Sequence, residues 1–234
     1  MEIKIAIEKI DKDIAGLTGD TVEVIERPNG GISIVLADGQ IDNRSSKMVS
    51  SIVTNRVLGS ISKGLRDGAS IRAAAQSIYA EFQGKVQANL NIISVDLQTN
   101  TIIVSRNNPI PAFVIHEERV DCLSGDIEPI GAHQEVNPSI IELPIRSEMS
   151  VVVFSDGVYN AGSQTKMVMD ICGTIEAFIE EQEPTEKEIA EFLLSRAIRL
   201  DNGQPADDMS IIVLQVTSRP SDSIRRMHIS MPLL

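Results

Sequence analysis

The feature that most constrains the fold is a series of short apolar segments between residues 90 and 154, two pairs of which are joined by very short turns. Each segment has the length and the branched apolar side chains of a β-strand. The turns Gln98–Asn100 and His116–Arg119 are too short for the crossover that parallel strands require, so neighbouring strands must pair antiparallel. The expected strands are Leu90–Leu97, Thr101–Ser105, Phe113–Ile115, Val120–Leu123, Ile140–Leu143 and Val151–Phe154.

Further strands are expected at both ends of the chain. Ile3, Ile5 and Ile7 occupy alternate positions in a stretch that includes the polar residues Glu2, Lys4 and Glu8, which predicts a half-buried strand. The strands Thr21–Glu26 and Ile32–Ala37 flank Pro28–Gly31, a strong hairpin turn. Met209–Val216 is expected to be the last strand.

Four helices are expected, grouped in two pairs along the chain: Ser45–Leu65, a helix capped by Ser70 that reaches about Gln83, Lys166–Glu181, and Glu186–Arg199. The last of these opens with Thr185 and Glu188 at the spacing of a capping box. Two helix pairs and about ten antiparallel strands predict an α+β fold, a four-layer αββα sandwich of two stacked antiparallel sheets flanked by helix pairs.

The chain shows no internal repeat and no Pro/Gly/Ser-rich linker, which favours one domain over residues 1–217. Residues 218–234 outlast the last expected strand and form a C-terminal tail. A disordered tail is the simpler interpretation. A docking or dimerisation segment is the alternative.

Composition excludes several classes of partner. A net charge of −12 and a sequence pI of about 4.7 repel nucleic acids and anionic membranes. No apolar run approaches the ~18 residues that span a bilayer. Cys122 and Cys172 lie in apolar contexts and are interpreted as small core residues in a reducing compartment. We therefore expect a cytoplasmic protein with no nucleic-acid or membrane partner.

Acidic residues gather at the ends of the expected strands. Asp38-Gly39 follows Ile32–Ala37, Asp156-Gly157 follows Val151–Phe154 and Ser155, and Asp207-Asp208 directly precedes the last strand; Asp20 precedes Thr21–Glu26. Each Asp-Gly pair alone is also a good turn, in which the glycine takes a positive φ. Together, carboxylates crowded at one sheet edge would repel one another unless cations neutralise them.

The residue types select the metal. The three histidines include no ligand pair and the cysteines are far apart in sequence, whereas an all-oxygen set suits Mn²⁺ or Mg²⁺. Two such ions would lower the pKa of a bridging water, and the resulting hydroxide could attack phosphorus in line. No nucleophile elbow, Walker loop or Cys-based phosphatase loop occurs in the sequence, which fits a phosphate-ester hydrolase of this type.

At these residues the chain resembles the PPM-type metal-dependent serine/threonine protein phosphatases, and more closely their bacterial SpoIIE-like branch. The resemblance covers about Ala15 to Val216 and depends on the order and spacing of short motifs. They are Leu17-Thr18-Gly19-Asp20, Leu36-Ala37-Asp38-Gly39, Asn107-Asn108-Pro109-Ile110-Pro111, Pro129-Ile130-Gly131, Phe154-Ser155-Asp156-Gly157 and Ala206-Asp207-Asp208-Met209-Ser210.

The resemblance implies two Mn²⁺ or Mg²⁺ ions at the edge of the sandwich. Asp38 would bridge both ions and the Gly39 carbonyl would ligate one of them. Asp156 and Asp207 would complete the shell of the other ion, Asp20 would act through water, and Asp208 is the less favoured ligand of its pair. Asp38 and Asp156 would thereby serve catalysis through a metal-activated water.

The same resemblance implies the substrate. It would be phosphoserine or phosphothreonine in a regulatory protein of the sigma-factor or stress-signalling type. Monomer and homodimer both stay open. Arg44 and Lys47 could contact the substrate phosphate, although a solvated helix start is the simpler interpretation.

One departure from the family pattern follows Asp38-Gly39, where further glycines are usual and this chain has Gln40 to Ser46. Ile41 cannot take glycine-only backbone angles cheaply, so the loop follows another path or the site is weakened. Gln40 cannot act as a general acid. A pseudophosphatase that binds a phosphoprotein without turnover is therefore the main alternative, and a hydrolase of small phosphate esters is a third.

Overall fold

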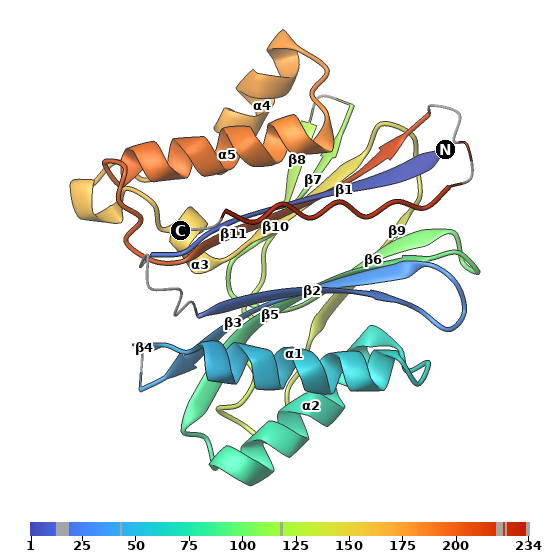
Figure 1. The fold of residues 1–234 in the computed structure, drawn as a ribbon, viewed down its shortest axis with the longest axis vertical. Helices are drawn as coiled ribbons and strands as arrows, with labels where there is room; N and C mark the ends of the chain where they lie inside the picture. Colours follow the sequence, from blue (N-terminus) through green and yellow to red (C-terminus); the bar gives the residue numbers. More distant parts are fainter. Residues whose placement is uncertain (13–18, 43, 118, 219–221, 223, 233–234) are drawn as a thin grey trace.

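The computed structural model describes residues 1–12, 19–42, 44–117, 119–218, 222 and 224–232, and its strands form two antiparallel sheets (Figure 1). The five-stranded sheet has the order β1 (Glu2–Ile10), β11 (Met209–Thr217), β10 (Ser150–Phe154), β7 (Ala112–His116), β8 (Arg119–Leu123). The six-stranded sheet has the order β2 (Asp20–Glu26), β3 (Ile32–Ile41), β5 (Val86–Asp96), β6 (Thr101–Asn107), β9 (Ser139–Pro144), with β4 (Arg44–Ser45) paired to the end of β3.

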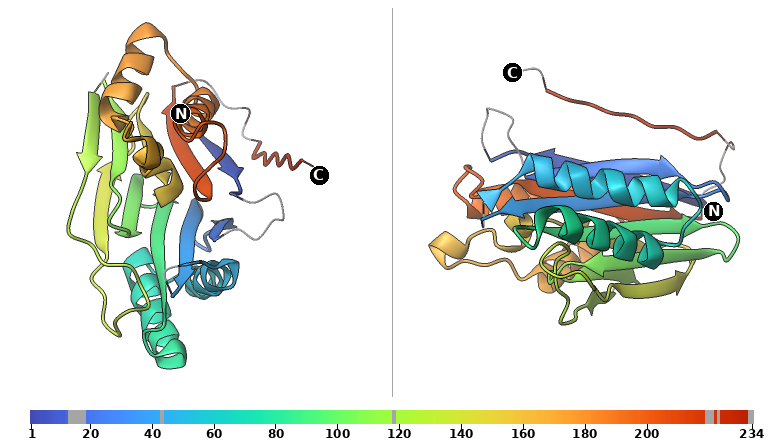
Figure 2. Two further views of the ribbon diagram at one scale, coloured as in Figure 1. Left: turned by 90° about the vertical axis from the view of Figure 1, so that its left-hand side faces the viewer. Right: turned by 90° about the horizontal axis from the view of Figure 1, so that it is seen from below.

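Two pairs of helices cover the outer faces of the sheets (Figures 1 and 2). The helices α1 (Lys47–Ile61) and α2 (Asp67–Phe82) lie on the six-stranded sheet, and α4 (Ile171–Glu181) and α5 (Glu186–Leu200) lie on the five-stranded sheet. The short α3 (Asp156–Tyr159) and the 3₁₀ helix η1 (Ser163–Thr165) connect β10 to α4. The expected αββα sandwich of two stacked sheets flanked by helix pairs is confirmed.

Three apolar cores follow from the alternation of side chains along the strands, because successive residues of a strand point to opposite faces. On β3, Ile34 and Leu36 point to the core between the sheets, whereas Val35 and Ala37 point to the core beneath α1 and α2. A third core joins the outer face of the five-stranded sheet to α4 and α5. The central strands of each sheet, such as β3, β10 and β11, are therefore buried on both faces, which explains their near-continuous apolar sequences.

The short turns set the strand order as expected. The hairpin at Pro28–Gly31 joins β2 to β3, and antiparallel ladders join β5 to β6 and β7 to β8. The capping box of α5 is also present, since the Thr185 side chain accepts from the Glu188 amide and the Glu188 side chain accepts from the Thr185 amide.

Two helix starts were wrong in the sequence reading. Helix α2 begins at Asp67, and Ser70 lies buried inside it instead of capping it. Helix α4 begins at Ile171, five residues after Lys166. Lys166 has a φ of 60°, which is incompatible with a helix, and the Asp170 side chain caps α4 by accepting from the Gly173 amide.

The cysteines are not core residues, contrary to expectation. Cys122 is exposed on the edge strand β8, and Cys172 is half-buried near the start of α4. The two side chains meet where α4 packs on β8, because the Cys172 thiol forms a hydrogen bond with Cys122, and burial is the main cause of its raised pKa.

A buried ion pair ties the β2–β3 hairpin to α2. Arg27 Nη1 lies 2.6 Å from Asp67 Oδ1, and the two side chains are 10% and 1% exposed. The same nitrogen donates to the hydroxyls of Ser33 and Ser94. Asp67 also stands in the first turn of α2, where a negative charge is favourable to the helix dipole.

The tail described at residues 222 and 224–232 forms neither helix nor strand and runs alongside the sandwich (Figures 1 and 2). Its large apolar side chains Ile224, Met227, Ile229 and Met231 are exposed, and Arg225 lies 3.5 Å from Glu26 of β2. The division into residues 1–217 and 218–234 stays a prediction. Within the described ranges, no helix is both long and apolar enough to cross a bilayer.

Candidate metal centre

Asp20 and Asp38 lie opposite each other on the neighbouring strands β2 and β3. Asp38 also pairs in register with Asn89 of β5, whose Nδ2 donates to Asp38 Oδ2 at 3.0 Å. Both aspartates are nearly buried, at 1% and 4% exposure. The six-stranded sheet thus brings two carboxylates and one carboxamide into a single cross-strand row.

Asp156 and Asp207 come from the five-stranded sheet. Asp156 begins α3 directly after β10, and Asp207 lies two residues before β11, the strand that pairs with β10. The ladder continues past Phe154, because the Ser155 amide donates to the Ser210 carbonyl at 3.0 Å and the Ser210 amide donates to Ser155 Oγ at 2.9 Å. These bonds place both acids at the same end of the sheet.

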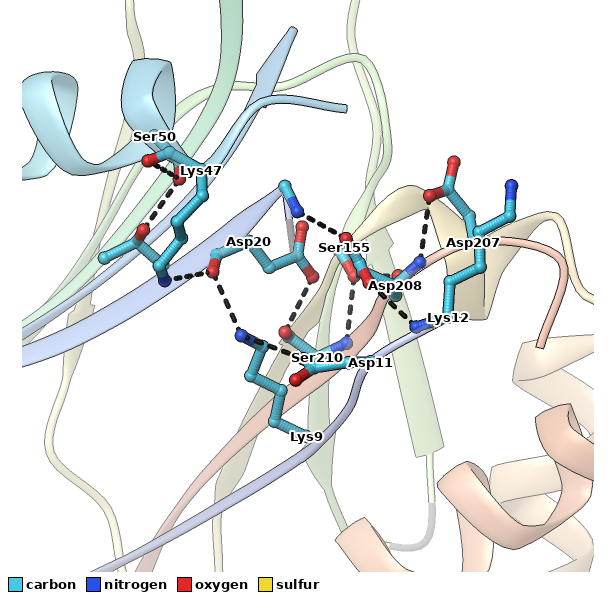
Figure 3. Close-up of polar contacts among 12 residues, drawn as sticks. Lys9, Asp11, Lys12, Asp20, Lys47, Ser50, Ser155, Asp207, Asp208 and Ser210 are labelled. Carbon is cyan, nitrogen blue, oxygen red and sulfur yellow. Dashed lines mark hydrogen bonds and ion pairs between the residues drawn. The ribbon is translucent and has the colours of Figure 1, made fainter. Parts of the chain in front are cut away.

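Ser210 joins the two sheets at this end. Its Oγ donates to Asp20 Oδ2 at 2.6 Å, across the interface between β11 and β2 (Figure 3). Ser45 of β4 makes a second link, because its Oγ donates to Asp207 Oδ1 at 3.1 Å. All four candidate aspartates therefore belong to one edge of the sandwich, as the sequence predicts.

The neighbouring acids Asp207 and Asp208 have different hydrogen-bond partners. Both carboxylate oxygens of Asp208 accept main-chain amides, one from Lys12 at 2.9 Å and one from Gly19 in a short bond (Figure 3). Asp208 thereby holds the two chain ends that flank residues 13–18. Asp207 keeps one oxygen without a described protein donor, and its role as the ligand of the pair stays a prediction.

The glycine of each Asp-Gly pair serves close packing. Neither Gly39 nor Gly157 has a positive φ, so the simple turn interpretation is wrong for both. A Cβ on Gly39 would lie 2.3 Å from the Ser50 amide nitrogen of α1, and one on Gly157 would lie 2.2 Å from the Asp208 carbonyl oxygen. Only glycine lets α1 and the 207–208 turn approach the acids this closely.

The backbone after Asp38 shows whether Ile41 must adopt the angles of the glycines that are usual in the family. Strand β3 does not end at Ala37 but continues to Ile41, which pairs with Val86 of β5 and with Arg44 of β4. Ile41 therefore has ordinary strand geometry, and Asp42 is the residue with a positive φ, at 50°. The Gly39 carbonyl accepts from the Ser46 amide at 2.7 Å and keeps a second lone pair.

Burial and mutual repulsion raise the pKa values of these acids. Burial raises the pKa of Asp20 to about 8, and the charge of Asp38 adds to the rise. Burial raises the pKa of Asp156 to about 7, with further contributions from Asp38 and Asp207. Burial also raises the pKa of Asp38. The hydrogen bond from Asn89 acts in the opposite direction, because it stabilises the charged carboxylate. The acids thus share one electrostatic environment that a cation would relieve.

Two lysines converge on the main chain at Asp20. Lys47 Nζ donates to the Asp20 carbonyl oxygen at 2.6 Å and Lys9 Nζ at 3.1 Å (Figure 3). Burial lowers the pKa of Lys47, and the charge of Lys9 lowers it further. Lys47 therefore anchors the start of α1 to β2 and is not simply solvated, whereas Arg44 is exposed on β4. A contact of either residue with the substrate phosphate stays a prediction.

The donor chemistry fits a hard divalent cation, because carboxylate and carbonyl oxygens are the ligands that Mn²⁺ and Mg²⁺ prefer. The side-chain arrangement is looser than that of a bound site. Within the described part of the chain, no three His, Cys, Asp or Glu side chains converge on one point as metal ligands would. Holding an ion would require these side chains to turn toward one another.

The sequence profile described as Stage II sporulation protein E (SpoIIE) matches residues 28–217. The chain belongs to the SpoIIE family. Stage II sporulation protein E of Priestia megaterium is 20% identical over 200 residues, a match that covers 86% of this chain and 34% of that relative. The SpoIIE-family chain thus spans about a third of the length of this curated relative.

Solved structures share the fold. The PP2C phosphatase domain of SpoIIE from Bacillus subtilis, with a fragment of its regulatory domain, superposes with a TM-score of 0.78 at 18% identity over 92% of this chain and 64% of that one. The catalytic domain of the serine/threonine protein phosphatase PstP, in complex with two manganese ions, superposes with a TM-score of 0.68 at 17% identity. The match covers 92% of this chain and 99% of the PstP chain. The SpoIIE-family chain therefore has the fold of PPM-type serine/threonine phosphatases.

Several residues at the centre were missed from the sequence. Asn89, Ser155 and Ser210 bond to the acids or to the strands that carry them. The available signal was a polar residue inside an apolar strand next to a motif acid. That signal identifies a polar residue as a candidate site residue. It does not identify the group to which the side chain bonds, because that group lies on a strand distant in sequence.

Proposed function

We propose that this chain is a metal-dependent protein serine/threonine phosphatase that hydrolyses phosphoserine or phosphothreonine in a regulatory protein. The observation that supports it most is the grouping of the buried Asp20 and Asp38 with the half-buried Asp156 beside Asp207, with pKa values raised by burial and by each other. Burying like charges together costs free energy without a compensating cation. The fold family and its manganese-bound member PstP support the same function.

In this proposal the ligands of two Mn²⁺ or Mg²⁺ ions are Asp38, the Gly39 carbonyl, Asp156 and Asp207, with Asp20 acting through water. Such ions, when bound, supply a more acidic water and neutralise the charge of the phosphoryl group. The protein's own bonds orient the ligands. Asn89 fixes the Asp38 carboxylate and Ser45 that of Asp207.

The substrate and partner belong to the same proposal. A relative named for sporulation favours a phosphorylated regulatory protein of the sigma-factor or stress-signalling type, and the net charge of −12 disfavours nucleic acid. Whether the protein is a homodimer stays a prediction. The glycine-poor loop after Asp38 no longer supports a pseudophosphatase, since Ile41 lies in an ordinary strand.

Calorimetric titration with Mn²⁺ and hydrolysis of an aryl phosphate and a phosphoserine peptide test the proposal. We expect the wild-type protein to bind Mn²⁺ and to require it for both reactions. Asp38→Asn and Asp156→Asn should each lower Mn²⁺ affinity and reduce turnover at least about 100-fold, the scale on which loss of transition-state charge stabilisation acts.

Asp121→Asn on β8 is the matched control, because Asp121 is exposed and the chemical change is the same. It should bind Mn²⁺ and turn over as wild type does. A wild-type protein that hydrolyses neither substrate faster than the Asp38→Asn, Asp156→Asn double variant would overturn the proposal.

A further inference from the structure

The β3–β5 ribbon extends beyond the candidate metal centre. Past the Asp38–Asn89 row, Gln40 pairs with Gln87 and Ile41 with Val86. Gly39 and Ala88 point toward α1 and its core. Because side chains alternate along a strand, Gln40 and Gln87 share the opposite face with Asp38. A polar row therefore continues directly from the metal centre on the same face.

A small cavity of about 250 Å³ lies at this extension. Its walls are Gln40 and Gln87 of the ribbon and the flanking residues Asp42, Gly84 and Lys85. This volume suits one amino-acid side chain better than a drug-sized ligand, for which pockets start at about 300 Å³. Within the described residues, the side chains of Gln87 and Lys85 form no hydrogen bond or ion pair, so both are available to a ligand.

We propose that this ribbon face is the docking subsite for an extended peptide segment beside the phosphorylated residue, with a preference for one acidic side chain at Lys85. The inference rests on the proposed phosphatase function and adds the substrate class. A strand advances about 3.3 Å per residue, so the Gln40–Gln87 row lies about 7 Å beyond Asp38 and Lys85 about 13 Å beyond. An extended substrate would place its second residue over the glutamines and its fourth beside Lys85.

The residue chemistry sets the preference. The Gln40 side chain forms a hydrogen bond with Asp38, whereas the Gln87 carboxamide can donate to and accept from the main chain or a polar side chain of a peptide. Lys85 is a cation on a chain with a net charge of −12 and attracts a carboxylate. Asp42 on the other wall repels further acids, so a single acidic residue is favoured over an acidic run.

The test uses four phosphoserine peptides that carry Glu or Lys four residues before or four residues after the phosphoserine. For each, kcat/KM is measured with Mn²⁺ and divided by kcat/KM for an aryl phosphate, which is too short to reach the subsite. We expect the Glu peptide of one direction to exceed its Lys counterpart about fivefold, the scale of one exposed charge contact. Lys85→Glu should reverse the preference for Glu over Lys. Gln87→Ala should lower kcat/KM, relative to that for the aryl phosphate, for both the Glu and the Lys peptide of that direction.

The matched control is Lys63→Glu, which makes the same charge reversal at an exposed lysine past the far end of α1. It should leave the Glu-over-Lys preference unchanged. Fluorescence anisotropy with labelled, dephosphorylated peptides gives a second readout that needs neither metal nor turnover. The same Glu preference, reversed by Lys85→Glu, is expected there.

The two hypotheses fail separately. If neither aryl phosphate nor any phosphopeptide is hydrolysed, the proposed function is wrong, and the anisotropy experiment still decides the subsite. If peptides are hydrolysed but Lys85→Glu changes the preference no more than Lys63→Glu in both readouts, the subsite is wrong and the function stands.

Discussion

Asp20 and Asp38 face each other in one cross-strand row, two nearly buried carboxylates on neighbouring strands. Like charges directly opposite in an antiparallel pair are destabilising. Burial in turn raises the pKa of Asp20 to about 8 and that of Asp156 to about 7. This row, together with Asp156 from the other sheet, therefore makes the stability of the metal-free protein depend on pH.

For these acids the folded-state pKa is higher than the unfolded value of about 3.9, so folding favours the protonated form. Their contribution to stability is complete below about pH 4 and is lost as the pH rises through 7 and 8. We expect the Tm of the metal-free protein to be at least about 4 °C lower at pH 8.5 than at pH 5.5. Saturating Mn²⁺ should remove most of this difference.

Asp38→Asn is the control for this pH effect, since it removes the charge that raises the pKa of both Asp20 and Asp156. Its Tm should change less with pH than that of wild type. A metal-free wild-type protein with equal or rising stability from pH 5.5 to 8.5 would contradict this electrostatic account.

Gly39→Ala should destabilise the protein by about 3 kcal/mol, because the new Cβ would meet the main chain of α1 at Ser50. Urea unfolding measures the change. Gly59→Ala, within α1, is the matched control: its Cβ meets nothing within 4 Å, and alanine should stabilise the helix by about 0.5 to 1 kcal/mol. Equal effects of the two changes would show that close packing at Gly39 does not matter.

Asp207→Asn and Asp208→Asn should have opposite signatures. Asp208→Asn places a carboxamide donor against one of two main-chain amides, which should cost about 2 kcal/mol of stability while Mn²⁺ still binds. Asp207→Asn should weaken Mn²⁺ binding with a smaller change in stability. Thermal unfolding and calorimetry separate the two, and the reverse assignment would show that Asp208 is the ligand.

Removing one member of the Arg27–Asp67 pair should cost about 3 to 5 kcal/mol, because the remaining charge stays buried. Arg27→Met and Asp67→Asn, combined in a double-mutant cycle by urea unfolding, measure the coupling. Lys187 and Glu191, an exposed pair on α5 at 3.4 Å, provide the comparison and should be coupled by less than about 0.5 kcal/mol. Similar coupling in both pairs would argue against a special role for burial.

Most of the fold followed from local patterns. The Pro28–Gly31 turn and the short turn before Thr101 set antiparallel neighbours whatever the rest of the chain does. Strand alternation on β3 then assigned Ile34 and Val35 to different cores. The predicted helix start at Ser70 was wrong because α2 begins at Asp67, whose tertiary partner Arg27 is distant in sequence. The predicted start at Lys166 was wrong because that residue has a positive φ, which local sequence does not reveal.

The site was predictable in part for the same reason. The order of the motifs brought Asp20, Asp38, Asp156 and Asp207 to one edge, because each adjoins or lies in a strand whose place is fixed by its neighbours. The packing role of Gly39 was not predictable, since the clash comes from α1. The continuation of β3 was also missed, because Asp38-Gly39 looks locally like a turn.

The extended β3 has a consequence for how this chain can diverge. Asp38 lies between paired strands on both sides, and paired residues continue beyond it to Ile41. Insertions or deletions between Ile41 and Arg44 would change the hairpin tip without moving the acid, much as surface loop tips generally tolerate such changes. We therefore expect homologues to vary the tip in length while the aspartate at the position of Asp38 keeps its place.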